Sequence, residues 1–214
     1  MSLARRVAAA KVGDVTDEGA RAVIEPDEVL RYWLDDVGPK GWYAADDAVD
    51  ATIRDRFGDA LALAADGGLR DWCDRARSSL AYIVLTDQFS RNVHRGEAAA
   101  FATDATARAA AQRAIHAGWD RRVDGPARMF FYMPLEHSES LEHQERAVRL
   151  FMLRMPQGGT DWLLHARAHR EVIRLFGRFP FRNEALGRSS TPAERDWLDA
   201  GAYGATVKAM QAGG

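Results

Sequence analysis

Two segments of the chain place an arginine and an asparagine side by side, each just after an apolar, aromatic-rich stretch. They are Arg91-Asn92 and Arg182-Asn183. One interpretation is structural: the asparagine adopts the left-handed conformation that ends a helix, and the arginine binds the last free carbonyl groups. The other is functional: two helix ends converge and present guanidinium and amide groups to an anionic or polar ligand, since arginine binds carboxylate and phosphate in a bidentate way.

A third segment could carry acid–base chemistry. Pro134 interrupts an apolar helix, which predicts that Glu136, His137 and Glu139 lie on an irregular stretch. A histidine flanked by carboxylates can serve as a general acid or base near neutral pH, with Glu136 or Glu139 orienting His137. The alternative is a helix start, in which a nearby serine caps the next helix, Glu139 complements its dipole and His137 binds a carbonyl group.

The predicted helix over residues 161–176 carries two features on different faces. His169 shares the buried side, where a histidine is either a satisfied core residue or a ligand-binding group. Arg170 belongs to a flanking stripe of arginines at 167, 170, 174 and 178, which is either a solvated face or the wall of a groove for an anion or for RNA. The spacing of His165 and His169 alone does not make a metal site, so we predict no metal and no cofactor.

The elements that position these residues are predicted to be helices throughout. Amphipathic spacing, prolines at first turns and glycine stops divide the chain into about eight helices, and no segment alternates as a strand would. The last start signal is the clearest, because Thr191 and Glu194 form a capping box around a first-turn proline. The predicted fold class is therefore all-α. Short connections between the helices favour antiparallel helical hairpins.

Composition limits the remaining possibilities. The 214 residues fit a single helical domain over residues 25–214, preceded by a weakly ordered lead-in over residues 1–24. A net charge of -2 argues against a protein that binds duplex DNA. The single cysteine, Cys73, excludes an internal disulfide, and neither a signal peptide nor a membrane-spanning run is recognisable. We therefore expect a cytoplasmic protein without a membrane partner.

Several blocks of the sequence resemble the bacterial family called domain of unknown function 924. They are LTDQFSRN at residues 85–92, FYMPLEHSE at 131–139, QERAV at 144–148, HREVI at 169–173 and GRFPFRN at 177–183. The resemblance implies a tetratricopeptide-like, right-handed helical array in a protein without an established activity. The chain departs from the family where relatives usually carry proline in place of Ser90 and histidine in place of Phe181.

These observations leave the function unknown and support three hypotheses. In the first, a groove lined by the two Arg-Asn pairs, His137, His169 and Arg170 binds a small anionic or polar ligand or a segment of a protein partner. In the second, the same pocket is the active site of an enzyme that uses His137 with Glu136 or Glu139 as general acid and base. In the third, the arginine stripe of residues 167–178 contacts RNA. A homodimer is compatible with each of them.

Overall fold

The structure is a computed structural model that describes residues 24–155 and 160–213. Within these two ranges every regular element is a helix and none is a strand, which confirms the all-α prediction. The lead-in predicted over residues 1–24 lies outside the described residues except for Ile24, and so does the proline–glycine stop predicted at residues 156–159. No described helix combines the length and the apolar character that crossing a membrane requires.

The described residues form eleven α-helical segments, with short 3-10 or π-helical pieces between several of them. The α-helices are α1 (Pro26–Leu30), α2 (Gly38–Gly41), α3 (Asp47–Ala65), α4 (Ala76–Ile83), α5 (Ser90–Val93), α6 (Asp104–His116), α7 (Met133–Glu136), α8 (Leu141–Arg154), α9 (Thr160–Phe176), α10 (Pro192–Asp199) and α11 (Ala202–Ala212). Helices α2, α5, α7 and α11 were not among the expected eight.

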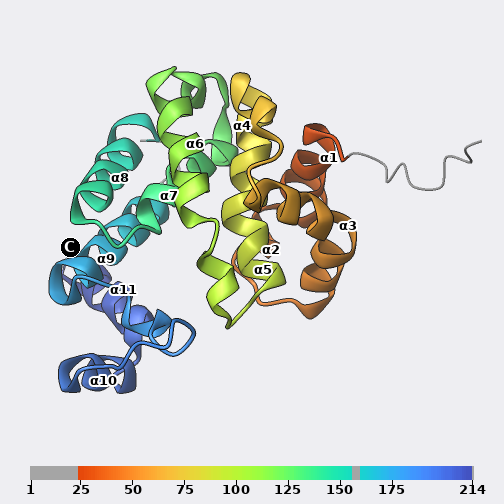
Figure 1. Ribbon diagram of the computed structural model, residues 1–214. Helices are drawn as coiled ribbons and strands as arrows, with labels where there is room; N and C mark the ends of the chain where they lie inside the picture. Colours follow the sequence, from red (N-terminus) through yellow and green to blue (C-terminus); the bar gives the residue numbers. More distant parts are fainter. Residues whose placement is uncertain (1–23, 156–159, 214) are drawn as a thin grey trace, which may run out of the picture.

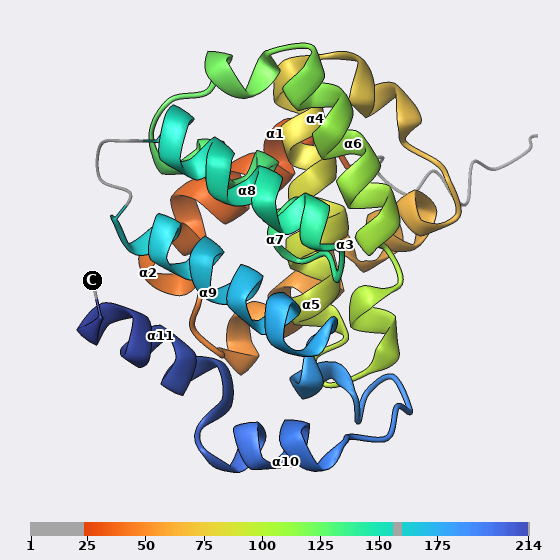
Figure 2. The same ribbon diagram turned by 90° about the vertical axis from the view of Figure 1, so that its left-hand side faces the viewer.

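The helices follow one another across the molecule roughly in chain order. Figure 1 shows α1 and α3 at one end, α4, α5 and α6 in the middle, and α8, α9 and α11 at the other end, while α2 lies toward the middle. Helix α8, which precedes α9 in the chain, packs along α9. Helix α11, which follows α9 and α10, also packs on α9 (Figure 2). Helix α9 therefore receives side chains from both neighbours, and this is where the candidate site lies.

An aromatic core underlies the first half of the fold. Trp33, Phe57, Phe89 and Phe130 are almost completely buried. The Phe89 ring lies 5.5 Å from the Trp33 ring and 5.0 Å from the Phe57 ring. Aromatic contacts of this kind add about 0.5–1.5 kcal/mol each beyond the area they bury. The segment that contains Phe89 is therefore firmly held in the interior.

The apolar spacing of the sequence predicts one helix over about residues 69–87, but the observed helix begins later and extends further. Helix α4 starts at Ala76 and continues through a π-helical segment, Val84–Phe89, into α5, which ends at Val93. Arg91 and Asn92 therefore lie within a helical turn, not beyond the helix end. Neither Asn92 nor Asn183 is left-handed, because Leu69 and Ala202 are the described non-glycine residues with positive φ. The predicted asparagine cap was wrong.

The capping box predicted at Thr191 and Glu194 is confirmed at the start of α10. The Asp46 side chain caps α3. Pro134, expected to end or kink a helix, instead lies in the first turn of α7, where its missing N–H costs nothing. As a result Glu136 is helical and His137 is the residue at which α7 ends.

Candidate functional site

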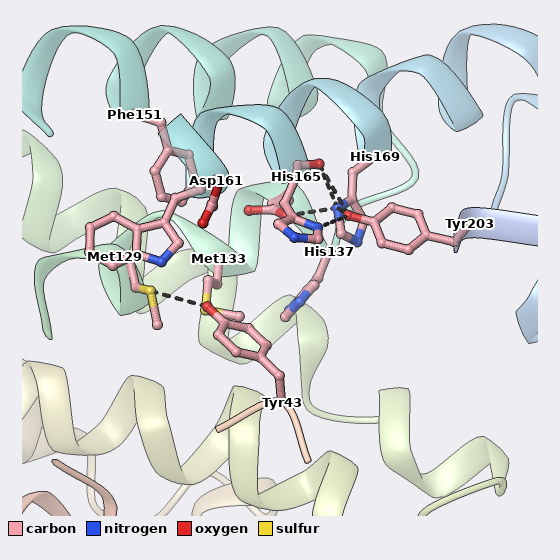
Figure 3. A pocket seen from close by; sticks show the side chains of 11 residues that line it. Tyr43, Met129, Met133, His137, Phe151, Asp161, His165, His169 and Tyr203 are labelled. Carbon is pink, nitrogen blue, oxygen red and sulfur yellow. Dashed lines mark hydrogen bonds and ion pairs between the residues drawn. The ribbon is translucent and has the colours of Figure 1, made fainter. Parts of the chain in front are cut away.

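A cavity of about 560 Å³ opens between α7, α9, α11 and the segment that follows α2. This volume lies within the range of pockets that hold small molecules. The residues that line it are Tyr43, Met129, Met133, Glu136, His137, Phe151, Asp161, Trp162, His165, His169 and Tyr203. In Figure 3 the three imidazoles lie toward Tyr203, while Met129 and Phe151 lie at the other end.

His137 is held in this cavity by a carboxylate that comes from another helix. Its Nδ1 lies 2.9 Å from Oδ1 of Asp87, in the π-helical segment. The Asp87 side chain is 1% exposed and that of His137 12% exposed. Inserted π turns are frequent at functional sites, since they redirect side chains within a helix. Here Asp87 lies in the π-helical segment behind His137, and it is not itself one of the residues that line the cavity.

The charges around this pair favour an ionised Asp87 and a neutral His137. Burial by itself raises the pKa of Asp87, but the charges of His137 and Arg91 and two hydrogen bonds outweigh it and hold the pKa at about 2. Burial lowers the pKa of His137, and Arg91 lowers it further, which together outweigh the opposite effect of Asp87. Near neutral pH the imidazole is therefore neutral, and its Nδ1–H donates to the carboxylate.

This arrangement leaves Nε2 of His137 with a free lone pair. Among the residues that the structure describes, Nε2 has no hydrogen-bond partner, and the ring lines the cavity. An imidazole whose Nδ1–H is bound to a carboxylate keeps its basic nitrogen available. The ring is thus oriented to accept a proton from a molecule in the cavity.

A second imidazole is bound in the same manner. Nδ1 of His169 lies 2.7 Å from Oε1 of Glu136 and 2.9 Å from the carbonyl oxygen of His165. The Tyr203 hydroxyl is 3.1 Å from the same nitrogen. Since a carboxylate and a carbonyl surround Nδ1, it carries the proton. The His137 and His169 rings lie 6.2 Å apart, so two carboxylate–imidazole pairs share one cavity.

Comparison with known proteins places the chain in a family. Residues 29–202 match the model of DUF924, described as a bacterial protein of unknown function. The chain belongs to this family. A solved structure of a protein of unknown function from Agrobacterium tumefaciens is 42% identical, covers 81% of this chain and 96% of its own, and superposes with a TM-score of 0.76. No curated protein matches.

The two arginines of the Arg-Asn pairs do converge in this DUF924 chain, but on a carboxylate. Nη2 of Arg91 lies 2.8 Å from one oxygen of Asp104, and Nη1 of Arg182 lies 3.3 Å from the other. Arg91 also donates to the carbonyl oxygen of Asp87 over 2.7 Å. Neither arginine lines the cavity. Both support the segment behind it, and Arg91 contacts the cavity only through Asp87.

The other predicted residues lie apart from His137. The Asn92 amide donates to Asp50, and the Asn183 amide to Ser190. Glu139 binds Arg188 in a bidentate manner and accepts from the backbone N–H of Phe179. Glu139 therefore fixes a loop, and the carboxylates that orient imidazoles are Asp87 and Glu136.

The arginine stripe of α9 is largely paired with carboxylates. Arg170 lies 3.4 Å from Glu145, Arg174 forms two hydrogen bonds with Glu171, and Arg178 forms two with Glu194. In the two described ranges no cluster of three or more histidine, cysteine, aspartate or glutamate side chains could hold a metal ion.

Sequence reasoning missed Asp87 and the aromatic residues of the cavity. Asp87 stands in the run from Leu80 to Phe89, in which it is the charged residue of a buried, mostly apolar stretch. A carboxylate there is rarely left unpaired, because an isolated buried charge is expensive. The sequence alone therefore indicated that Asp87 has a partner in the interior. Tyr43 and Tyr203 carry no such signal, since they come from opposite ends of the chain.

Removing the Arg91 charge should raise the pKa of His137. In Arg91→Gln the positive charge that opposes protonation of His137 is gone, while Asp87 remains. Protonation of His137 should therefore begin at higher pH than in the wild type, and any activity that needs the neutral ring should fail at correspondingly higher pH. The measurement is an NMR titration of the histidine Cε1–H signals. Arg95→Gln, which removes an arginine bound to Asp50, is the control and should leave His137 unchanged.

Proposed function

We propose that this protein is an enzyme that transfers protons on a small molecule bound in the cavity, with His137 as the general base. The observation that supports this most is the 2.9 Å contact between Nδ1 of His137 and the buried Asp87, which leaves Nε2 free toward the cavity. A carboxylate in this position holds the imidazole in one tautomer and stabilises the imidazolium that forms when it accepts a proton.

His169 is proposed as the partner acid. Glu136 and the His165 carbonyl hold its Nδ1–H, and the Glu136 carboxylate would stabilise the imidazolium, which is the form of the ring that can donate a proton from Nε2 to a ligand. Two imidazoles whose rings are 6.2 Å apart can act on neighbouring atoms of a single substrate. A positioned acid or base typically contributes about 10²–10⁴-fold to a rate.

The lining favours proton transfer over covalent catalysis by a hydroxyl, thiol or amine nucleophile. None of the cavity's lining residues in the described part of the chain is a serine, threonine, cysteine or lysine. Burial, and after it the charge of Glu136, raises the pKa of the Tyr203 hydroxyl, which makes it a poor nucleophile. The proposed base therefore acts on a water molecule that attacks the substrate, or on a proton of the substrate itself.

The hypothesis of an anionic ligand has less support. It depends on Arg91 and Arg182, and both guanidinium groups are bound to Asp104 behind the cavity. The arginine stripe offered for RNA is occupied by Glu145, Glu171 and Glu194. If the following experiment detects no turnover, it would favour a binding protein without catalysis.

Replacing either imidazole should abolish turnover without unfolding the protein. The purified protein is assayed against a panel of esters, lactones, amides and hydroxy ketones, and any reaction found is repeated with His137→Gln and His169→Gln. We expect each variant to lose about 10²–10⁴-fold in kcat because a proton-transfer group is gone. His116→Gln, which changes an exposed histidine of α6, should behave as the wild type. A reaction that survives in His137→Gln would refute the proposal.

Two further properties are proposed with this function. The order of helices along the molecule in Figure 1 supports a tetratricopeptide-like array, in which successive helices pack on their neighbours. Cys73 is a free, half-buried thiol, which suits the reducing environment of the cytoplasm.

A further inference from the structure

We infer that the cavity takes an amine: a small cationic molecule with an apolar, preferably aromatic, body. The inference rests on the proposed function, because it names the substrate class of the same site. It starts from the charges of the lining. Glu136 and Asp161 are carboxylates, and none of the cavity's described lining residues is an arginine or a lysine.

The two carboxylates lie at different depths. Glu136 is 5% exposed and belongs to the polar wall, where its Oε1 binds His169. Asp161 is exposed in the first turn of α9 and forms no ion pair with any residue in the described ranges. A carboxylate at the entrance and one that is buried within attract a cation and repel an anion.

Arg91, which contacts the cavity only through Asp87, is already paired with two carboxylates. Arg91 lies 3.4 Å from the Asp87 carboxylate and 2.8 Å from Asp104. Burial is the main reason that the pKa of the Tyr203 phenol is raised, and the second is the negative charge of Glu136. The negative charge of Glu136 therefore opposes ionisation of the Tyr203 hydroxyl. The same charge would stabilise an ammonium group bound in the cavity.

The rest of the lining fits an apolar body. Met129, Met133 and Phe151 are buried apolar side chains of the lining, and Figure 3 shows Met129 and Phe151 at the end away from Tyr203. Figure 3 shows Tyr43 and Tyr203 on two sides of the imidazoles. The faces of aromatic rings attract ammonium groups, by about 0.5–2 kcal/mol for each well-placed contact. The lining therefore combines apolar contacts at one end with carboxylates and aromatic faces that suit a cation.

The test compares three probes that differ mainly in charge: 2-phenylethylamine, 2-phenylethanol and phenylacetate. Binding to the full chain is measured by isothermal titration and by NMR shifts of the cavity residues at pH 8, where imidazoles ordinarily carry little charge. We expect the amine to bind at least about tenfold more tightly than the alcohol, and the acid to bind more weakly than either. Asp161→Asn should reduce the preference for the amine and leave alcohol binding unchanged, because it removes a charge at the entrance.

The control variant is Asp196→Asn, which removes an exposed carboxylate on α10 outside the cavity and should keep the full preference. Phenylacetate binding as tightly as the amine, the absence of binding by all three probes, or an unchanged preference in Asp161→Asn would each overturn the inference. These results are independent of catalysis. Amine binding together with turnover that survives in His137→Gln would refute the proposed function and leave the ligand class standing.

Discussion

Replacement of Asp87 by asparagine is expected to lower turnover by about 10²–10⁴-fold while the cavity keeps its shape. The two side chains have nearly the same volume, so the packing of the buried π-helical segment is preserved. What changes is the group that faces Nδ1 of His137. An ionised carboxylate there accepts the Nδ1–H and stabilises the imidazolium, and an amide does neither.

The surroundings of Asp87 decide how the amide would sit. The Gln88 amide nitrogen donates to Oδ2 of Asp87 over 2.5 Å, so that position requires an acceptor. The NH₂ group of the introduced asparagine would then face Nδ1 of His137, which lies opposite Oδ1 in the wild type. His137 would have to accept at Nδ1 and carry its proton on Nε2. In that tautomer the nitrogen that faces the cavity is no longer a base.

Nitrogen-15 NMR of the histidine ring separates this effect from a loss of structure. The wild type should show the Nδ1–H tautomer for His137, and Asp87→Asn the Nε2–H tautomer. Asp50→Asn is the matched control, because Asp50 is also a buried, ionised carboxylate but binds Asn92 and Arg95 outside the lining. An equal loss of turnover in Asp50→Asn would point to general destabilisation, and an unchanged His137 tautomer in Asp87→Asn would contradict the assigned geometry.

Replacement of Asp104 by asparagine should cost about 3 kcal/mol of unfolding free energy. This carboxylate is the shared partner of Arg91 and Arg182, whose side chains are 21% and 7% exposed. Burial lowers the pKa of Arg182 to about 10, so it remains charged at neutral pH. Its Nε is buried without a hydrogen-bond partner among the described residues. Without Asp104, Arg182 would lose its ion pair and Arg91 would keep only its longer contact with Asp87, so two cations would lie close together.

Urea denaturation measures this cost. Asp74→Asn removes the partner of Arg113 in an exposed pair, in which both side chains are more than half exposed, and should change stability by less than about 1 kcal/mol. Combining Asp104→Asn with Arg182→Met should recover part of the loss, because the uncompensated charge is replaced by an apolar chain among the Phe101 and Phe179 rings. A loss below about 1 kcal/mol in Asp104→Asn would mean that the network is not structurally important.

The same residues show why the site was predicted only in part. His137 and His169 were found because histidine is an uncommon residue whose chemistry is recognisable wherever it lies. Their partners were predicted from sequence neighbours, which is how Glu139 was offered to His137. The structure pairs His137 with Asp87, which is distant in the sequence, and ties Glu139 to Arg188. Which carboxylate meets which imidazole depends on how helices pack, and no local pattern encodes it.

The sequence by itself determined the helical class and several helix starts, because the signals for them are local. The capping aspartate at residue 46, the capping box of Thr191 and Glu194, and the apolar spacing along residues 104–116 act within a few residues of the backbone they organise. The tertiary structure decided the site, because a long polar side chain can reach any partner that packing brings within about 3 Å. Arg91 and Arg182 meet at Asp104 only once the segment after α9 lies against the rest of the fold. In the same way, Tyr43 and Tyr203 line one cavity only once α11 packs on α9.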